Sequence, residues 1–133
     1  MKTSIEHIQI NISDAKVSFP FYKELLSYFE YEIVKENEEC IGLSNGTTGI
    51  WVRQTKEKYK NAKFHRRATG LNHISFRVSS KEDVDKFTKE FLNKKGIKTL
   101  YETPKHFPEY TERYYAVFFE DPNRIKLEIT YKQ

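Results

Sequence analysis

The chain has 133 residues, enough for one domain with a buried core, and it is 38% hydrophobic and 32% charged, as globular proteins are. A single cysteine excludes an internal disulfide, no stretch approaches the ~20 apolar residues of a membrane helix, and the first residues lack the apolar run of a signal peptide. Because acidic residues are mixed with the basic ones, the net charge of +4 does not predict a nucleic-acid surface, and we expect a cytoplasmic protein that binds neither nucleic acid nor membrane.

The first half of the chain predicts a strand, a helix and three short strands. Apolar and polar residues alternate over 5–13, which is typical of a half-buried strand. Asp14 can cap a following helix, in which Pro20 is tolerated only near the start or at a kink. The apolar face of this helix would include Val17, Phe21, Leu25 and Leu26. Strand-like runs follow at 31–34, 39–43 and 50–52, with an Asn45-Gly46 turn before the last.

The second half predicts the same elements in the same order. An alternating strand over 71–79 leads to Ser80 and Asp83, whose spacing predicts a capping box. The helix would bury Val84, Phe87, Phe91 and Leu92, and Gly96 would end it. Strand-like runs follow at 97–101, 114–119 and 125–131, with Asp121-Pro122-Asn123 as a turn. The chain is therefore an internal repeat.

This repeat predicts an α+β fold made of two βαβββ modules, about 1–56 and about 70–133, within a single domain of residues 1–133. The helices would cover the outside of mostly antiparallel sheets. The segment 56–70 joins the modules, and its basic part is either a solvated loop or part of a cavity that attracts an anion.

Strand parity places both repeated histidines on the side away from the helices. His7 and Gln9 share one face of the first strand, and His73 and Ser75 share the matching face of its repeat. Glu128 lies opposite the apolar face of the last strand. If the sheet is concave on this side, His7, His73 and Glu128 can converge on a divalent ion. A single histidine on a strand is more often exposed or hydrogen-bonded than a metal ligand. The metal hypothesis therefore rests on the second histidine at the matching position of the repeat.

Three segments resemble the vicinal oxygen chelate superfamily, the glyoxalase/bleomycin-resistance/extradiol-dioxygenase group. They are the strands IEHIQI and LNHISFRV and the terminal DPNRIKLEI, whose Asp-Pro-x-x-x-x-x-Glu spacing is the most specific. The resemblance covers 5–131. It implies that the two modules form a cup-shaped mixed sheet around a metal site, with the helices outside. By this correspondence His7, His73 and Glu128 hold the ion, which would be Zn, Ni, Mn or Fe.

The fourth ligand position departs from the family pattern. Members similar to glyoxalase I carry Glu or Gln in the last strand of the first module, where this chain has GIWVRQ. Trp51 is the expected occupant, and its indole N–H cannot bind a cation. The parity of Gln54 argues against a role for that residue. A metal site here would have three protein ligands, as in the fosfomycin-modifying transferases and ring-cleaving dioxygenases of the family.

The resemblance implies a metal-dependent glyoxalase-like enzyme, of lyase or isomerase type, that acts on a small oxygen-rich substrate by bidentate metal chelation. Glu128 is also the candidate catalytic residue, as the one ligand carboxylate, which in four-ligand relatives can leave the metal to take a proton. The alternatives are a non-catalytic small-molecule or antibiotic-binding protein, as in bleomycin resistance, and a fosfomycin-type thiol transferase.

The expected substrate pocket contains Gln9, Trp51, Ser75 and Tyr115. Tyr115 belongs to an aromatic-rich stretch, 101–115, that would either cover the site or pack on the core. Because many members of the family are dimers, we expect a homodimer, with His7 joining His73 from the same chain or from its partner.

Overall fold

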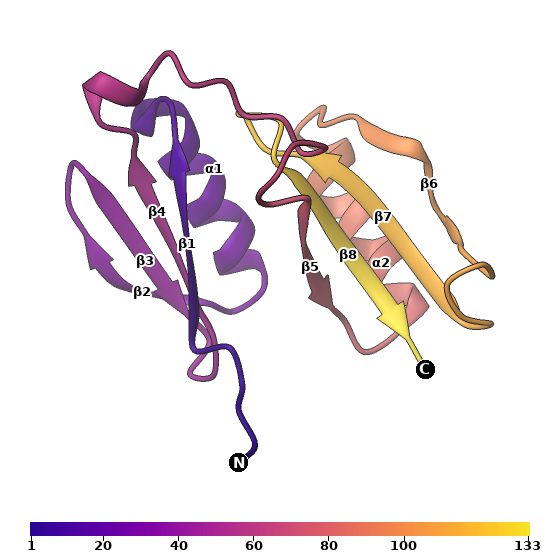
Figure 1. Ribbon diagram of the computed structural model, residues 1–133. Coiled ribbons are helices and arrows are strands. Elements are labelled where there is room, and N and C mark those ends of the chain that lie inside the picture. The colour runs from indigo at the N-terminus through magenta and orange to yellow at the C-terminus, as the bar shows by residue number, and fades with distance from the viewer. The chain divides into compact units, whose positions relative to one another are not determined.

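The computed structural model describes all residues, 1–133, as two compact units, 1–63 and 64–133. Each unit contains one four-stranded mixed sheet and one main helix, and the two sheets have the same strand order (Figure 1). The α+β fold and the βαβββ order of each module are therefore confirmed. The boundary between the units falls inside the segment 56–70.

Unit 1 contains β1 (His7–Ile12), α1 (Ala15–Tyr28), β2 (Glu32–Glu36), β3 (Cys40–Ser44) and β4 (Gly49–Gln54), followed by a 3-10 turn at Glu57–Tyr59. The strand order is β1-β4-β3-β2, in which β1 pairs with β4 in parallel and the other pairs are antiparallel. The strands lie within a few residues of their predicted positions.

The buried face of α1 includes the predicted Leu25 and Leu26 but differs from the prediction at the other two residues. Val17 is 53% exposed and Phe21 is half-buried. The buried residues are Ser18, Phe19, Tyr22, Leu25 and Leu26. The predicted row Val17–Phe21–Leu25 advances four residues at a time, which turns it by about 40° per step around a helix of 3.6 residues per turn. Val17 is therefore about 80° around the helix from the buried Leu25. The sheet-facing side is shared by the small Ser18 and the larger apolar residues.

Helix α1 also runs through Pro20, which stands well inside it rather than at its start. Pro20 is exposed, so water can reach the Lys16 carbonyl that loses its N–H partner there. The start of the helix is capped twice: the Asp14 side chain accepts from Lys16 N at 3.0 Å, and Gln54 Oε1 accepts from Ala15 N at 2.7 Å. The two caps stabilise the first turn of the helix, which offsets the backbone hydrogen bond lost at Pro20.

Unit 2 contains β5 (His73–Arg77), α2 (Lys81–Phe87) with a π-helical continuation η2 (Thr88–Asn93), β6 (Thr99–His106), β7 (Tyr114–Glu120) and β8 (Lys126–Lys132). Its order is β5-β8-β7-β6, with β5 and β8 parallel. The predicted cap is confirmed, since Ser80 Oγ accepts from Asp83 N at 3.1 Å. The predicted buried residues Val84, Phe87, Phe91 and Leu92 are confirmed as well.

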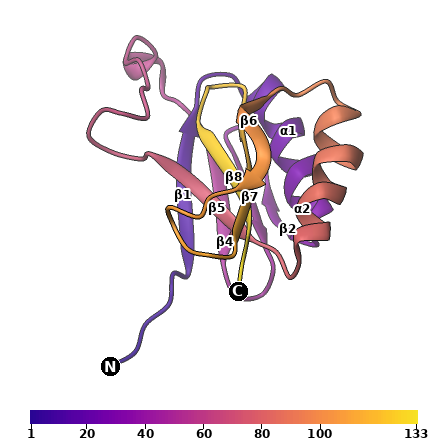
Figure 2. The ribbon, with the colours of Figure 1, turned by 90° about the vertical axis from the view of Figure 1, so that its right-hand side faces the viewer.

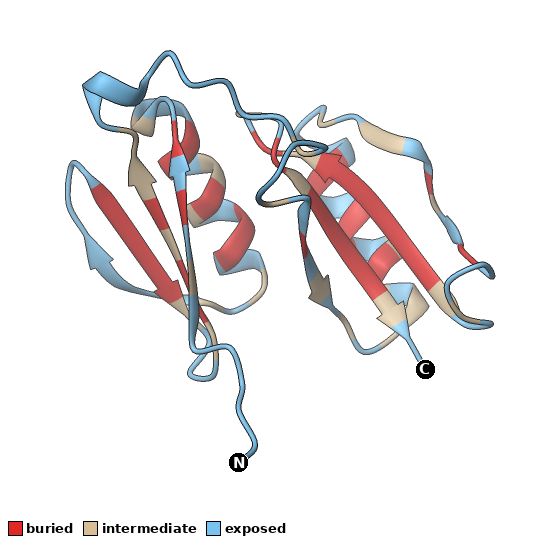
Figure 3. Cartoon of the chain, viewed as in Figure 1, coloured by how far each residue is buried: buried red, intermediate tan, exposed pale blue.

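In unit 2 the helix covers one face of the sheet and leaves the other free of helices (Figure 2). Strands β7 and β8 are almost wholly buried (Figure 3). No helix of the structure has the length and apolar character needed to cross a membrane.

Candidate metal and ligand site

The helix-free face of unit 2 carries a row of functional side chains. In the parallel pair of β5 and β8, His73 is opposite Lys126 and Ser75 is opposite Glu128. Because partners in register share a face, these four side chains lie on the same side of the sheet. In the next pair Phe118 is opposite Glu128, which adds a ring from β7 to this face.

The turn before β8 sets the position of Glu128. Asp121 is buried, and its Oδ1 accepts from the backbone N–H groups of Asn123 and Ile125, each at 2.8 Å. An aspartate that bonds to its own following backbone favours such a turn. Since β8 begins directly after it, this aspartate fixes the strand register and therefore the face that Glu128 occupies.

Glu128 and His73 form the central pair of the site. The glutamate is 1% exposed, and its Oε2 lies 3.3 Å from His73 Nε2. Its other oxygen, Oε1, accepts a hydrogen bond from the hydroxyl of Tyr114 at 2.6 Å. A carboxylate removed from water needs such partners, because an unpaired buried charge is strongly unfavourable.

Asn72 orients the imidazole of His73. Its Nδ2 donates to the carbonyl of Arg66 at 3.2 Å, which turns its Oδ1 toward His73 Nδ1, 2.7 Å away. An amide oxygen can only accept, so Nδ1 carries the proton of the ring. In a neutral imidazole the lone pair is then on Nε2, which faces Glu128.

This arrangement fits a cation between His73 and Glu128. Two acceptor atoms cannot hydrogen-bond to each other, so the contact is favourable only with a proton or a metal ion between them. Ligand atoms about 2.0–2.2 Å from a shared ion are about 3–3.5 Å apart, which agrees with the 3.3 Å between Nε2 and Oε2. No three His, Cys, Asp or Glu side chains are close enough to hold an ion as a group. The structure thus brings together two of the three predicted ligands.

A pocket of about 420 Å³ opens over this pair. It is lined by His73, Tyr101, Phe107, Tyr110, Tyr114, Phe118, Lys126 and Glu128. All of these residues belong to unit 2, and five of the eight are Phe or Tyr. The volume is in the range of small-molecule sites, and the mixture of apolar walls with a few polar groups is typical of them.

Burial, followed by the hydrogen bond to Glu128, raises the pKa of Tyr114. The phenol therefore stays protonated at neutral pH and remains a donor inside the pocket. The side chains of Ser75 and Thr130 also interact with this phenol. The expected pocket residue Ser75 is thus beside the site, although it does not line the pocket itself.

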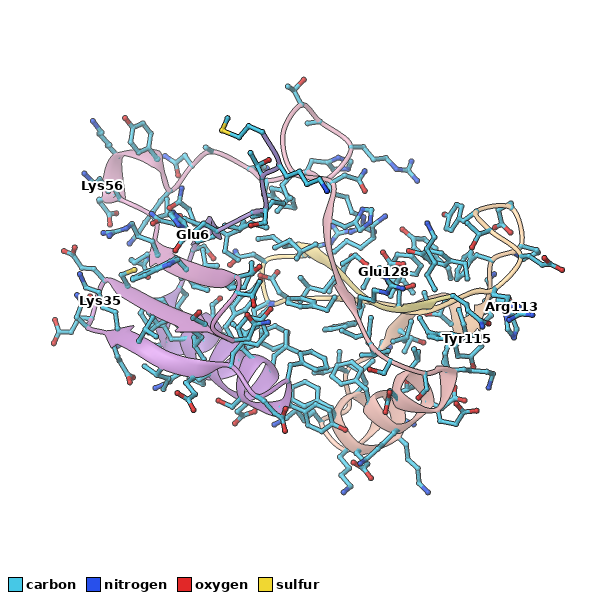
Figure 4. All side chains as sticks on the ribbon, turned by 90° about the horizontal axis from the view of Figure 1, so that it is seen from below. Glu6, Lys35, Lys56, Arg113, Tyr115 and Glu128 are labelled. Atoms are coloured by element: carbon cyan, nitrogen blue, oxygen red, sulfur yellow. The ribbon has the colours of Figure 1, made fainter.

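Tyr115 lies on the other face of β7, toward α2. Its hydroxyl donates to Asp85 Oδ1 at 2.6 Å, while Lys81 Nζ donates to Asp85 Oδ2 at 2.8 Å and lies over the Tyr115 ring. Glu128 and Tyr115 are seen on opposite sides of the sheet in Figure 4. Burial would raise the pKa of Asp85, but the hydrogen bonds from Lys81 and Tyr115 and the charge of His106 lower it. The aromatic residue at the pocket is the neighbour, Tyr114.

In unit 1, His7 occupies the equivalent position of the repeat. Its Nδ1 contacts the carboxylate of Glu6, as Asn72 contacts His73, so its Nε2 is also left available as a ligand atom. The ring of Trp51 lies against His7, with centroids 6.5 Å apart. Gln9 is exposed on the same face, opposite Trp51 in the register.

Trp51 stands where the repeat in unit 2 has Glu128. In β4 it is opposite Gln9 and Gly42, as Glu128 is opposite Ser75 and Phe118. The indole covers Gly42 so closely that a Cβ there would be 2.6 Å from Trp51 Cε3. Gln54, the other residue considered for a fourth ligand, is on the helix side and binds Ala15 N and the Ser13 carbonyl.

Comparisons with known proteins agree with this topology. Residues 4–129 match the Glyoxalase/Bleomycin resistance protein/Dioxygenase superfamily. The uncharacterized protein YqjT of Bacillus subtilis is 34% identical over 94% of this chain and 96% of its own. The metallothiol transferase FosB of Staphylococcus epidermidis is 25% identical over 96% of this chain and 80% of its own.

Among solved structures, that of a proposed glyoxalase from Bacillus halodurans superposes with a TM-score of 0.87 and 36% identity, covering 96% of this chain and 95% of its own. The family match spans nearly the whole sequence, and both modules have the expected strand order. The chain therefore belongs to the Glyoxalase/Bleomycin resistance protein/Dioxygenase superfamily.

Proposed function

We propose that this protein is a metal-dependent glyoxalase-like enzyme, of lyase or isomerase type, that acts on a small oxygen-rich molecule. His7, His73 and Glu128 would hold the ion. The observation that carries the proposal is the buried carboxylate of Glu128, 3.3 Å from an imidazole nitrogen whose lone pair is directed at it. Such a pair is unfavourable without a proton or a metal ion between the two atoms, and two imidazoles with one carboxylate are a common ligand set.

A bound divalent ion would act as a Lewis acid toward two neighbouring substrate oxygens and stabilise negative charge that develops on them. The chain's own residues would do the rest. The protonated hydroxyl of Tyr114 donates a hydrogen bond to Glu128 Oε1, so these two groups are placed to exchange a proton with a substrate. The surrounding rings would exclude water from the reacting atoms.

The test is the metal content of the purified protein, measured by elemental analysis beside His7→Ala, His73→Ala and Glu128→Ala. His65→Ala is the matched control, because His65 is exposed and its Nδ1 only accepts from Arg67 N. We expect near-stoichiometric Zn, Ni, Mn or Fe in the wild type and the control, and loss in the three ligand variants. A folded wild type that takes up no metal after reconstitution would contradict the proposal and favour a non-catalytic binding protein.

A thiol transferase is the second candidate, favoured by the similarity to FosB over 96% of the chain. This activity would consume one thiol for each epoxide opened, whereas a lyase or isomerase acting on a single substrate would not. Mixing the metal-loaded protein with fosfomycin and a low-molecular-weight thiol, and following free thiol with a chromogenic reagent, separates the two. Thiol loss that requires Glu128 would support the transferase.

We further propose a cytoplasmic homodimer. His7 then comes either from the same chain as His73 or from the partner, and mixing two inactive variants distinguishes these arrangements. Random exchange between His7→Ala and Glu128→Ala dimers would restore about a quarter of the metal sites if each site is shared between chains. If each site lies within one chain, mixing would restore none.

A further inference from the structure

The pocket of unit 2 has walls that are unusually rich in aromatic rings. Phe107 and Tyr110 are stacked at 5.3 Å, and both Tyr110 and Phe107 meet Tyr114 edge-on. Phe118 meets Phe107 in the same way. These rings present flat and edge surfaces to whatever enters, and such surfaces pack best against another planar group.

Lys126 brings an ammonium group to this pocket, and it has no anionic partner. Its Nζ lies over the rings of Phe118 and Tyr101, 5.4 and 5.6 Å from their centroids, and it makes no ion pair. The nearby guanidinium of Arg66 differs, because it is paired with Glu120 at 2.6 Å. An ammonium held over aromatic faces at a pocket is available to an anion that enters.

The backbone of β6 is strained where it forms the pocket wall. Tyr101 and Glu102 have φ angles of 57° and 55°, and the pairing with β7 is interrupted between Leu100 and Lys105. Left-handed backbone at two successive residues with side chains is unfavourable and persists where the surroundings impose it. Here the irregularity places Tyr101 against Phe118 and under Lys126, which completes the wall.

We propose that this pocket binds a small organic anion with an aromatic or otherwise planar body, whose carboxylate or phosphonate head pairs with Lys126. The body would lie among the rings of Phe107, Tyr110 and Phe118. Lys126 precedes Glu128 by two residues on the same face, so the anionic head would be bound about 7 Å along the strand from the carboxylate. That this ligand is a substrate rests on the proposed function, whereas its binding does not require a metal.

The experiment titrates the metal-free, full-length protein with four probes and follows amide chemical shifts by NMR. Benzoate and phenylphosphonate carry the planar body with either anionic head. Benzamide has the same shape without charge, and methylphosphonate has the charge without the ring. We expect saturable shifts in unit 2 with the first two probes, and binding at least tenfold weaker with each of the other two.

Two variants assign the contacts. Lys126→Gln should weaken benzoate binding at least tenfold and leave benzamide unchanged, whereas Lys126→Arg should retain benzoate. Lys132→Gln removes the same charge from the exposed end of the same strand and should bind benzoate as the wild type does. Equal affinity for benzoate and benzamide, or undiminished benzoate binding by Lys126→Gln, would overturn the proposal.

This outcome is independent of the metal experiment. Benzoate binding to a protein that takes up no ion would leave the anion pocket standing and remove the proposed enzyme. Metal uptake without benzoate or phenylphosphonate binding would remove the proposed anion pocket and leave the metal site standing.

Discussion

Replacing Asn72 with a side chain that cannot accept a hydrogen bond should weaken metal binding, although Asn72 is not a proposed ligand. Its Oδ1 accepts from His73 Nδ1 at 2.7 Å and so holds the lone pair on Nε2, toward Glu128. Asn72→Leu removes the acceptor in a side chain of similar size. Asn72→Asp keeps an oxygen at the same place, and both variants lose the bond to the Arg66 carbonyl. The difference between the two variants therefore isolates the contact with the imidazole.

Loss of such a partner typically lowers metal affinity by about 10–100-fold. Asn72 is exposed, so water can replace its oxygen, and the smaller figure applies. We expect Asn72→Leu to bind Zn²⁺ about tenfold more weakly than the wild type, equivalent to about 1.4 kcal/mol. Asn72→Asp should bind as tightly as the wild type or more tightly, because a carboxylate is the stronger acceptor and makes the ring more basic.

The assay is competition for Zn²⁺ against a chromogenic chelator at pH 7, with unfolding curves for each variant to confirm equal folding. Equal affinities of Asn72→Leu and Asn72→Asp would refute the idea that this contact orients the imidazole. If His73→Ala also bound Zn²⁺ normally, the histidine itself would be excluded as a ligand.

Three further predictions concern the scaffold. Gly42→Ala places a Cβ 2.6 Å from the Trp51 ring and should lower the free energy of unfolding by about 1–3 kcal/mol, measured in urea through the emission of this single tryptophan. Glu102 has a φ of 55°, which glycine adopts readily and a β-branched residue does not. In the same urea assay, Glu102→Gly should leave the free energy of unfolding unchanged or raise it by up to about 1 kcal/mol, whereas Glu102→Val should lower it. Because folding lowers the pKa of Asp85, its ionised carboxylate stabilises the fold at pH values above 3.8, the ordinary pKa of this group. The urea midpoint of the wild type should therefore exceed that of Asp85→Asn at neutral pH, and the difference should vanish as the pH falls through the folded-state pKa.

Much of the fold could be predicted because the repeat states the same pattern twice. The alternation in β1 and β5 gives the period of a half-buried strand, and the register confirms that His73 and Glu128 share the helix-free face. The cap at Ser80 and the turn at Asp121 are local signals, and both are present with their hydrogen bonds.

The wall of the pocket could not be predicted in the same way. Strand β7 reads YYAVFFE and is buried on both faces, so its sequence contains no alternation to separate Tyr114 from Tyr115. Only the register with β8 decides, because Tyr114 pairs with Lys132 and Phe118 with Glu128, which puts both rings on the pocket side. Similarly, the left-handed residues of β6 carry no glycine to mark them, and the predicted strand ended at Tyr101.

The two units preserve one topology while they differ at the position that matters for chemistry. Trp51 and Glu128 are equivalent in register, and so are the residues across from them, Gly42 and Phe118. In unit 1 the large ring comes from β4 and the space for it from β3; in unit 2 the ring comes from β7 and β8 carries the carboxylate. Trp51→Glu would therefore not reproduce in unit 1 the site of unit 2. It would leave the surface over Gly42 uncovered, and unit 1 would still lack an equivalent of Tyr114, the hydrogen-bond donor to Glu128 in unit 2. Unit 2 combines a carboxylate, an oriented imidazole and a pocket, and because of this difference between the units we propose that the chemistry takes place there and that unit 1 contributes one ligand, His7.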